Sequence, residues 1–367
     1  MFDLLAATLY QPLYLLIIMI LMFLAYQKYR FIDKNTEFSK ENVVGTILVV
    51  LFFIFFIGMR PVSTVFNDMG AYDLIYKLEE GHEFTLNRDA ENRLFDNIFS
   101  WWSAKELGIT SFFLFIATIY FGAAFLGIRR LFPHHTLMAY LVFLGAFSTF
   151  SYATNGIKAG AAASIFIWAI SYRQRPFVCI PLMLISWGFH HSMVLPIAAY
   201  IITVFFKNPY YYYIGWSLCF LISLLHINYF SNFFSGYADE RGAEYLLDTL
   251  NNGFRLDFIL YSAVPILIGY LLQCHKRINV SSTYSTLINL YTTINGVWLL
   301  CMYASFTNRI AYLSWFLYPI VLIYPFLYEN WGPNKYTIFK KIIIYQFGFT
   351  VFMELIYYGN LIRILGL

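Results

Sequence analysis

Two histidines and a lysine, at the ends of two consecutive apolar segments, are the residues of this sequence best placed to do chemistry. Lys158 lies at the start of the first segment and the pair His190-His191 at the end of the second, and a basic turn, 172–176, joins them. If both segments are membrane helices, the hairpin returns the chain to the side that it left. An ammonium group that attracts anions and an imidazole that can act as a general base near neutral pH would then share one side of a bilayer.

The spacing places these groups below the outer surface of the bilayer. About 15 residues separate Lys158 from the basic turn, and about 15 separate the turn from His190, whereas a helix needs about 20 residues to cross the hydrocarbon. Ionisable residues at such a depth are costly and are therefore functional candidates. Neighbours on a helix point about 100° apart, so we expect at most one of the two histidines to face a cavity with Lys158. The alternatives are a lysine that snorkels to the interface and histidines that are satisfied within the core.

Further ionisable groups follow the same logic at other apolar segments. Arg60 ends the second apolar segment and Arg309 lies at the start of a late one; a guanidinium there can hold a phosphate through two hydrogen bonds, or can snorkel. Asp68 is a second candidate base. Arg255 is a weaker candidate, because Asp257 could neutralise it locally.

The composition predicts an all-α polytopic integral membrane protein. Hydrophobic residues make up 60% and charged residues 12% of the chain, against about 25% charged residues in soluble domains. We expect a single integral membrane domain over residues 1–367, with the four cysteines as packing residues. The net charge of +4 does not indicate nucleic acid. The apolar segments predict about twelve spans, near 4–26, 43–59, 110–128, 136–154, 157–172, 177–190, 193–206, 213–229, 256–272, 284–303, 310–328 and 342–359.

The distribution of charge in the loops predicts the orientation. Lys and Arg are concentrated in one set of loops, which we place in the cytoplasm. The longer loops 60–108 and 230–255 then face outward. In the first we expect an amphipathic helix over 67–80, with an ion pair between Asp73 and Lys77.

The pair Trp101-Trp102 is expected to anchor the end of the first loop at the interface. In the second loop we expect an amphipathic helix from Gly236 to Leu250. Its charged face, which includes Arg241 and Glu244, would suit sugar hydroxyls or would simply be solvated.

Taken in order, these motifs resemble the EpsG-like branch of the Wzy-type polysaccharide polymerases over about residues 1–330. The resemblance implies a bacterial inner-membrane enzyme with a glycosyltransferase-C-like helical bundle. Such an enzyme joins undecaprenyl-pyrophosphate-linked oligosaccharide repeats into O-antigen or a similar surface polysaccharide on the periplasmic face. The motifs are Arg60, Asp68 and Tyr72 after an apolar run, Asn155-Gly156-Ile157-Lys158, His190-His191-Ser192, and Asn308-Arg309-Ile310-Ala311-Tyr312.

The resemblance, combined with the charges, suggests roles for the candidate residues. Arg60, Lys158 and Arg309 would bind the pyrophosphate and stabilise the leaving group, and His190, His191 or Asp68 would take the proton of the acceptor hydroxyl. With the charge held in this way we expect neither a metal nor another cofactor. The partners would be lipid-linked donor and acceptor, membrane lipid, a chain-length regulator and a flippase. Weaker glycan contacts are assigned to Tyr72, Arg241, Glu244, Arg255 and Tyr312.

Three other classes of protein compete with this hypothesis. A transporter of glycan or lipid-linked glycan should line the midplane with polar groups, often at broken helices related by repeats. Here the ionisable groups gather toward one face and no repeat is visible, which favours an enzyme. A membrane acyltransferase that modifies the glycan would need a cytoplasmic acyl-donor site, for which the sequence gives no motif. A non-catalytic assembly partner of the glycan machinery is the third alternative.

Overall fold

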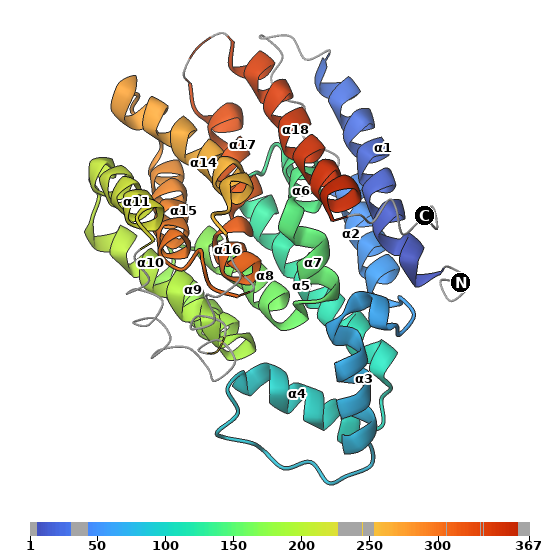
Figure 1. Ribbon diagram of the computed structural model, residues 1–367. Coiled ribbons are helices and arrows are strands. Elements are labelled where there is room, and N and C mark those ends of the chain that lie inside the picture. The colour runs from blue at the N-terminus through green and yellow to red at the C-terminus, as the bar shows by residue number, and fades with distance from the viewer. Residues whose placement is uncertain are drawn as a thin grey trace. The chain divides into compact units, whose positions relative to one another are not determined.

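The computed structural model describes residues 6–30, 43–226, 244, 253–305, 307–330, 332 and 334–358, and every regular element in these ranges is a helix (Figure 1). The all-α prediction is therefore confirmed for the described chain. The predicted helix over 236–250 lies outside the described residues, apart from Glu244, which is exposed. The glycosyltransferase-C-like topology stays a prediction.

Several helices are suited to a membrane by length and composition. Four described helices are long and apolar enough to cross it, namely Ala7–Gln27, Ile109–Leu131, Leu256–His275 and Thr307–Tyr328. Four more are apolar but shorter: Val43–Gly58, Ile157–Ser171, Pro176–Phe189 and His191–Phe205. These helices fit a multi-pass membrane protein, whereas the number of about twelve spans stays a prediction.

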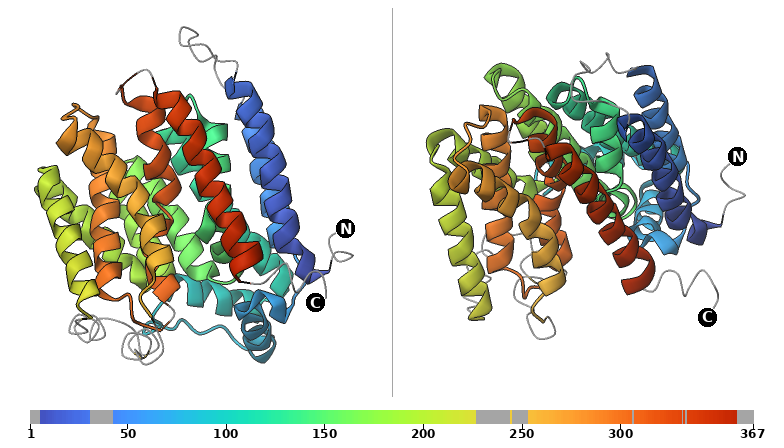
Figure 2. Two further views of the ribbon diagram at one scale, coloured as in Figure 1. Left: turned by 45° about the horizontal axis from the view of Figure 1, so that its top comes forward. Right: turned by 90° about the horizontal axis from the view of Figure 1, so that it is seen from above.

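The chain forms two compact units, one of residues 1–191 with 337–367 and one of residues 192–336. The single membrane domain stays a prediction beside this division. The first unit includes both ends of the described chain, α1 and α18 (Figure 2). Its helices are α1 (Tyr10–Arg30), α2 (Val43–Gly58), α3 (Asp68–Glu79), α4 (Arg93–Ala104), α5 (Ile109–Leu131), α6 (Thr136–Leu144), α7 (Phe147–Thr154), α8 (Ile157–Ser171), α9 (Pro176–Phe189) and α18 (Lys335–Val351), which a π-helical turn, Phe352–Tyr357, extends.

Close packing of α5 on α8 forms the centre of the first unit. Gly127 allows it, because a Cβ there would lie 2.8 Å from the side chain of Ile167 and 2.9 Å from its backbone. At the end of α5, Arg130 donates through Nε to the carbonyl of Ser171 (2.9 Å) and lies 3.9 Å from the ring of Tyr172. A cation thus caps the carboxyl end of α8, where the helix dipole favours it.

The segment predicted as one span over 136–154 is instead two helices, α6 and α7, bent by 72°. The break falls at Gly145-Ala146, where the carbonyl of Phe143 accepts both from the backbone N–H of Ala146 (3.1 Å) and from the side chain of Thr149 (2.6 Å). The hairpin of α8 and α9 matches the predicted segments 157–172 and 177–190 to within a residue or two.

Loop 60–108 contains two helices at one end of the first unit (Figure 1). The predicted helix over 67–80 is confirmed as α3, and Lys77 pairs with Asp73 at 2.7 Å as expected. The second helix, α4, was not predicted. Its residues Phe95, Phe99 and Trp102 pack on Phe112 of α5.

The second unit has its core around two buried tryptophans. Trp315 donates to Ser262 (2.7 Å) and Trp298 to Thr307 (3.0 Å), so both indole N–H groups are satisfied inside the unit. The helices of the second unit are α10 (Val194–Phe205), α11 (Pro209–Leu224), α14 (Leu256–Tyr270), which a π-helical turn, Leu271–His275, extends, α15 (Ser282–Leu300), α16 (Thr307–Trp315) and α17 (Tyr318–Tyr328).

Candidate functional site

The amino end of α8 fixes the place of Lys158, the second residue of that helix. Gly160, two residues later, allows α8 to pack directly on α7, since a Cβ there would lie 2.5 Å from the carbonyl oxygen of Tyr152. This packing brings Lys158 to the end of the hairpin opposite the basic turn.

The ammonium group of Lys158 is neutralised by a partner from α4. Its Nζ lies 2.6 Å from Oδ1 of Asp96, and both side chains are about one-quarter to one-third exposed, at 26% and 30%. The same Nζ lies 4.9 Å from the ring centroid of Phe95 and 5.9 Å from that of Tyr72. The lysine does not snorkel alone; it is held by one carboxylate beside two aromatic rings.

The first turn of α4 also contacts the second histidine. Asn92, buried at the start of α4, accepts through Oδ1 from the backbone N–H of His191 (3.0 Å). The Nδ1 atom of His191 lies 3.5 Å from Oε1 of Glu91. A carboxylate at Nδ1 favours the tautomer in which Nε2 is the proton acceptor. Two of the predicted site residues, Lys158 and His191, thus contact the same short segment, 91–96.

The two histidines do not have the geometry of helix neighbours. Helix α9 ends at Phe189, and His190 is extended, with φ −151° and ψ 120°. The imidazole rings lie nearly parallel, with centroids 6.3 Å apart and planes at 15°. The expected helical geometry of the pair is wrong, because α9 ends before it. That at most one of the two histidines faces a cavity with Lys158 stays a prediction. The contact with Glu91, and not the helical angle, distinguishes His191.

Tyr72 belongs to an aromatic cluster beside the ion pair. Its ring lies 6.0 Å from that of Phe95, 5.9 Å from that of Phe99 and 6.4 Å from that of Phe113. It is half-buried, and its ring centroid lies 5.9 Å from Nζ of Lys158. Tyr72 and Lys158 are therefore brought together, as their places in the motif suggested.

Arg60 is sealed inside the first unit, with 1% of its surface exposed. Its guanidinium donates to the carbonyls of Ile57 (2.8 Å) and Thr154 (3.0 Å) and lies 5.0 Å from the ring of Phe113. Burial lowers the pKa of Arg60 to about 9, so the group remains charged at neutral pH. Its two terminal nitrogens thus join the ends of α2 and α7, while Nε is buried without a hydrogen-bond partner.

The remaining predicted residues are more dispersed. Asp68 is the half-exposed first residue of α3, where the helix dipole favours an acid. In the second unit, Arg309 is exposed on α16 and Tyr312 is buried against Trp315. The predicted local neutralisation of Arg255 is confirmed, because Asp257 accepts from it at 2.9 and 2.6 Å. Glu244 is exposed, and Arg241 lies outside the described residues.

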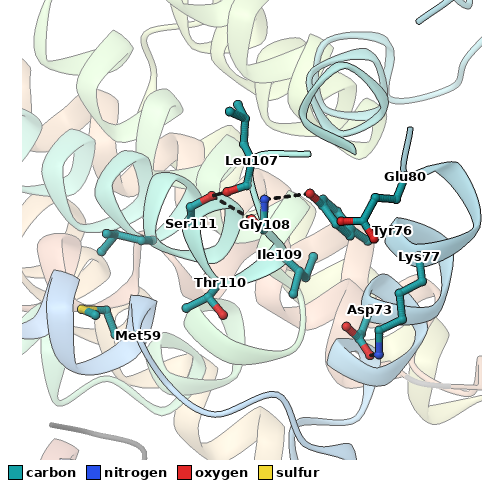
Figure 3. Close-up of a pocket in the computed structure, with 11 residues that line it drawn as sticks. Met59, Asp73, Tyr76, Lys77, Glu80, Leu107, Gly108, Ile109, Thr110 and Ser111 are labelled. Carbon is teal, nitrogen blue, oxygen red and sulfur yellow. Dashed lines mark hydrogen bonds and ion pairs between the residues drawn. The ribbon is translucent and has the colours of Figure 1, made fainter. Parts of the chain in front are cut away.

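A separate groove of about 590 Å³ lies between α3 and the start of α5 (Figure 3). Asp73, Lys77 and Glu80 form its polar side, and Met59 with Leu114 forms part of its apolar side. Tyr76 closes one end by accepting from the backbone N–H of Gly108 (2.7 Å). Lys158 and His191 do not line this groove. Across the described ranges no group of three or more His, Cys, Asp or Glu side chains is arranged to hold a metal ion.

Local sequence pattern did not reveal Glu91, Asn92 and Asp96, which contact the predicted groups; the first two precede α4 and Asp96 lies in its first turn. Phe95, Phe99 and Trp102 recur at i, i+4 and i+7, a spacing typical of an amphipathic helix. That pattern would have placed Asp96 on a helix, although its pairing with Lys158, 62 residues away, is not visible in any local pattern.

Comparison with known proteins identifies the class to which this fold and site belong. The model of the EpsG family matches residues 43–363, so the chain belongs to the EpsG family. EpsG-like proteins are similar to the Wzy-type polymerases, and the resemblance inferred from the motifs is thereby confirmed. Membership indicates a membrane protein with a polysaccharide polymerase-like function. Neither the curated proteins nor the solved structures include a match to this chain.

Proposed function

We propose that this protein polymerises lipid-linked oligosaccharide repeats into a surface polysaccharide such as O-antigen. The family match over residues 43–363 carries the class of activity. The contacts that Lys158 and His191 both make with the first turn of α4 support the choice of site. The donor and acceptor are proposed to be undecaprenyl-pyrophosphate-linked oligosaccharides, used at the periplasmic face of the inner membrane.

In the proposed reaction, a hydroxyl of the acceptor sugar attacks the anomeric carbon of the donor. A glycosidic bond forms, the bond from that carbon to the phosphate oxygen breaks, and undecaprenyl pyrophosphate leaves with the bonding electrons. Nε2 of His191 takes the hydroxyl proton, because Glu91 lies against Nδ1 and favours the tautomer with a free Nε2. Lys158 stabilises the negative charge that develops on the diphosphate.

Arg60 is assigned a different part in this proposal. Its hydrogen bonds to main-chain carbonyls hold the ends of α2 and α7, and α7 leads directly into α8 and Lys158. It would thus support the site without touching the substrate. Arg309 stays a candidate phosphate-binding residue and Asp68 a candidate proton-transfer residue. An alanine variant of each tests its role.

The decisive experiment is genetic deletion followed by electrophoresis of the surface glycan. A single-repeat band supports a polymerase and full-length ladders on complementation confirm it. Complete loss of surface glycan would point to export, and unchanged ladders with altered acylation would point to an acyltransferase.

Point variants then test the residue roles. Complementation with Lys158→Ala or His191→Ala should give the single-repeat band, whereas Asp73→Asn, which removes a carboxylate from a comparable ion pair on α3, should give full ladders. Membrane levels and thermal midpoints equal to wild type are needed for the comparison. Long chains from normally folded Lys158→Ala would refute the role of Lys158.

A further inference from the structure

The ion pair between Lys158 and Asp96 creates a problem for any anion that is to use Lys158. The ammonium group already has an anionic partner at 2.6 Å. The other oxygen of Asp96 accepts from the backbone N–H of Asn92 (3.2 Å), so the same carboxylate also caps the start of α4. A phosphate group can take the position of this carboxylate on Lys158 only if the side chain of Asp96 moves away.

The charges around the site sharpen this conflict. Lys158 pairs with the carboxylate of Asp96, and His191 lies against the carboxylate of Glu91. With neutral His191, these four side chains carry a net negative charge. A diphosphate that approached them in this arrangement would be repelled, although the proposed chemistry requires one.

Glu91, Asn92 and Asp96 all belong to the amino end of α4, and each of them contacts either Lys158 or His191. From these contacts we infer that the first turn of α4 is a latch and that Asp96 is its positioning residue: its carboxylate occupies the place of the substrate diphosphate on Lys158, and diphosphate binding displaces it. The inference rests on the proposed function, because it takes a diphosphate as the competing anion.

The two ends of α4 are attached in different ways. At the carboxyl end, Trp102 donates to Ser111 (2.8 Å) and Ser103 donates to the carbonyl of Tyr76 (3.3 Å), which ties α4 to α5 and α3. The amino end follows a segment, 80–92, without regular structure. It is held by the polar contacts already named, by Leu94, which packs on Gly188 of α9, and by the ring of Phe95, which packs on Phe112 and Phe189. The side chain of Asp96 is partly exposed beside these apolar contacts, so it can leave Lys158 while they hold.

The contact of Leu94 with Gly188 offers a way to lock the latch. A Cβ built on Gly188 lies 3.3 Å from the Cβ of Leu94, close to the 3.5–4.5 Å typical of disulfides. The double variant Leu94→Cys/Gly188→Cys should therefore form a disulfide that fixes the first turn of α4 on α9.

The first test measures binding of inorganic pyrophosphate to the purified full chain in lipid nanodiscs. Removal of the competing charge in Asp96→Asn should tighten binding by about fivefold, the range expected for a partly exposed ion pair. Asp73→Asn is the matched control and should bind as wild type does. A merely structural role of Asp96 would weaken binding or leave it unchanged, and either result would overturn the latch.

Lys158 variants separate failure of the latch from failure of the proposed function. Binding should be lost in Lys158→Ala and equally in Lys158→Ala/Asp96→Asn. If Lys158→Ala binds pyrophosphate as wild type does, or if wild type and Asp96→Asn both fail to bind it, Lys158 is not a diphosphate ligand, and both proposals fall. If Lys158→Ala loses binding but Asp96→Asn does not gain it, the latch alone is wrong.

The second test uses the disulfide lock in cells that lack the native gene. The oxidised double-cysteine variant should produce the single-repeat band, and growth with dithiothreitol should restore the ladder. The Leu94→Cys variant and the wild type, both under oxidant, are the controls, and they also report any effect of oxidation on the four native cysteines. Full ladders from quantitatively cross-linked protein would overturn the latch.

Discussion

Replacement of Arg60 distinguishes a structural guanidinium from one that binds substrate. Alanine removes the donors to two buried carbonyls, those of Ile57 and Thr154. The carbonyl of Ile57 keeps the backbone N–H of residue 60 (3.4 Å), whereas that of Thr154 loses the side-chain donor. A buried acceptor left unsatisfied costs about 1–3 kcal/mol, and the emptied volume adds a cavity term. We therefore expect the free energy of unfolding to fall by about 3–5 kcal/mol, which in a body of this size lowers the thermal midpoint by roughly 10 °C.

The assay for Arg60 is the thermal midpoint of the purified protein in detergent, followed by intrinsic fluorescence, beside the length of the glycan made in cells. Arg60→Met is the matched variant, because it fills much of the volume without restoring a donor and should be intermediate in stability. Arg88→Ala, at an exposed arginine of the segment before α4, should change the midpoint little. An Arg60→Ala protein with a wild-type midpoint and no long glycan would refute the structural role and return Arg60 to the phosphate site.

Three further predictions follow from the site and its packing. His191→Ala should abolish chain elongation. Glu91→Gln should lower the polymerisation rate about 10- to 100-fold, as loss of an orienting carboxylate does at metal-bound histidines. Equal activity of Glu91→Gln and wild type in a glycan-length assay would contradict the pairing of Glu91 with His191. Gly188→Ala should disturb α4, since its Cβ would lie 2.6 Å from Leu94, and Leu94→Ala in the same chain should restore activity, whereas a double variant no better than the single would argue against this contact. Gly160→Ala should cost about 1–3 kcal/mol of stability, measured as a fall in thermal midpoint, because the clash is with backbone that cannot rotate away; an unchanged midpoint would show that α7 and α8 can separate without loss.

The sequence was sufficient for features that depend on local pattern. The hairpin of α8 and α9 followed from two apolar runs and a basic turn, and α3 followed from its spacing of polar and aromatic residues. The local pair of Arg255 with Asp257 was also visible, because a single residue separates the partners.

The parts that could not be predicted depend on contacts between distant segments or on where a helix stops. Asp96 was missed because its partner, Lys158, is 62 residues away. The helical geometry expected for the two histidines was wrong, because α9 ends at Phe189, one residue before His190. For Arg60 the sequence offered a phosphate clamp or a snorkelling side chain, and neither alternative included acceptors on α7, which the fold brings to it.

The bond from Arg60 to Thr154 also bears on how the chain is made. Its two partners are 94 residues apart, and a ribosome that adds about 5–20 residues per second needs roughly 5–20 s to make that length of chain. During this interval the guanidinium has the carbonyl of Ile57 but lacks that of Thr154, and an incompletely paired charge is costly in hydrocarbon. We therefore expect the carboxyl end of α2 to stay near the aqueous boundary until α7 is synthesised. If translation is arrested within this interval, Arg60 should stay accessible to membrane proteases, whereas in the finished protein it is buried.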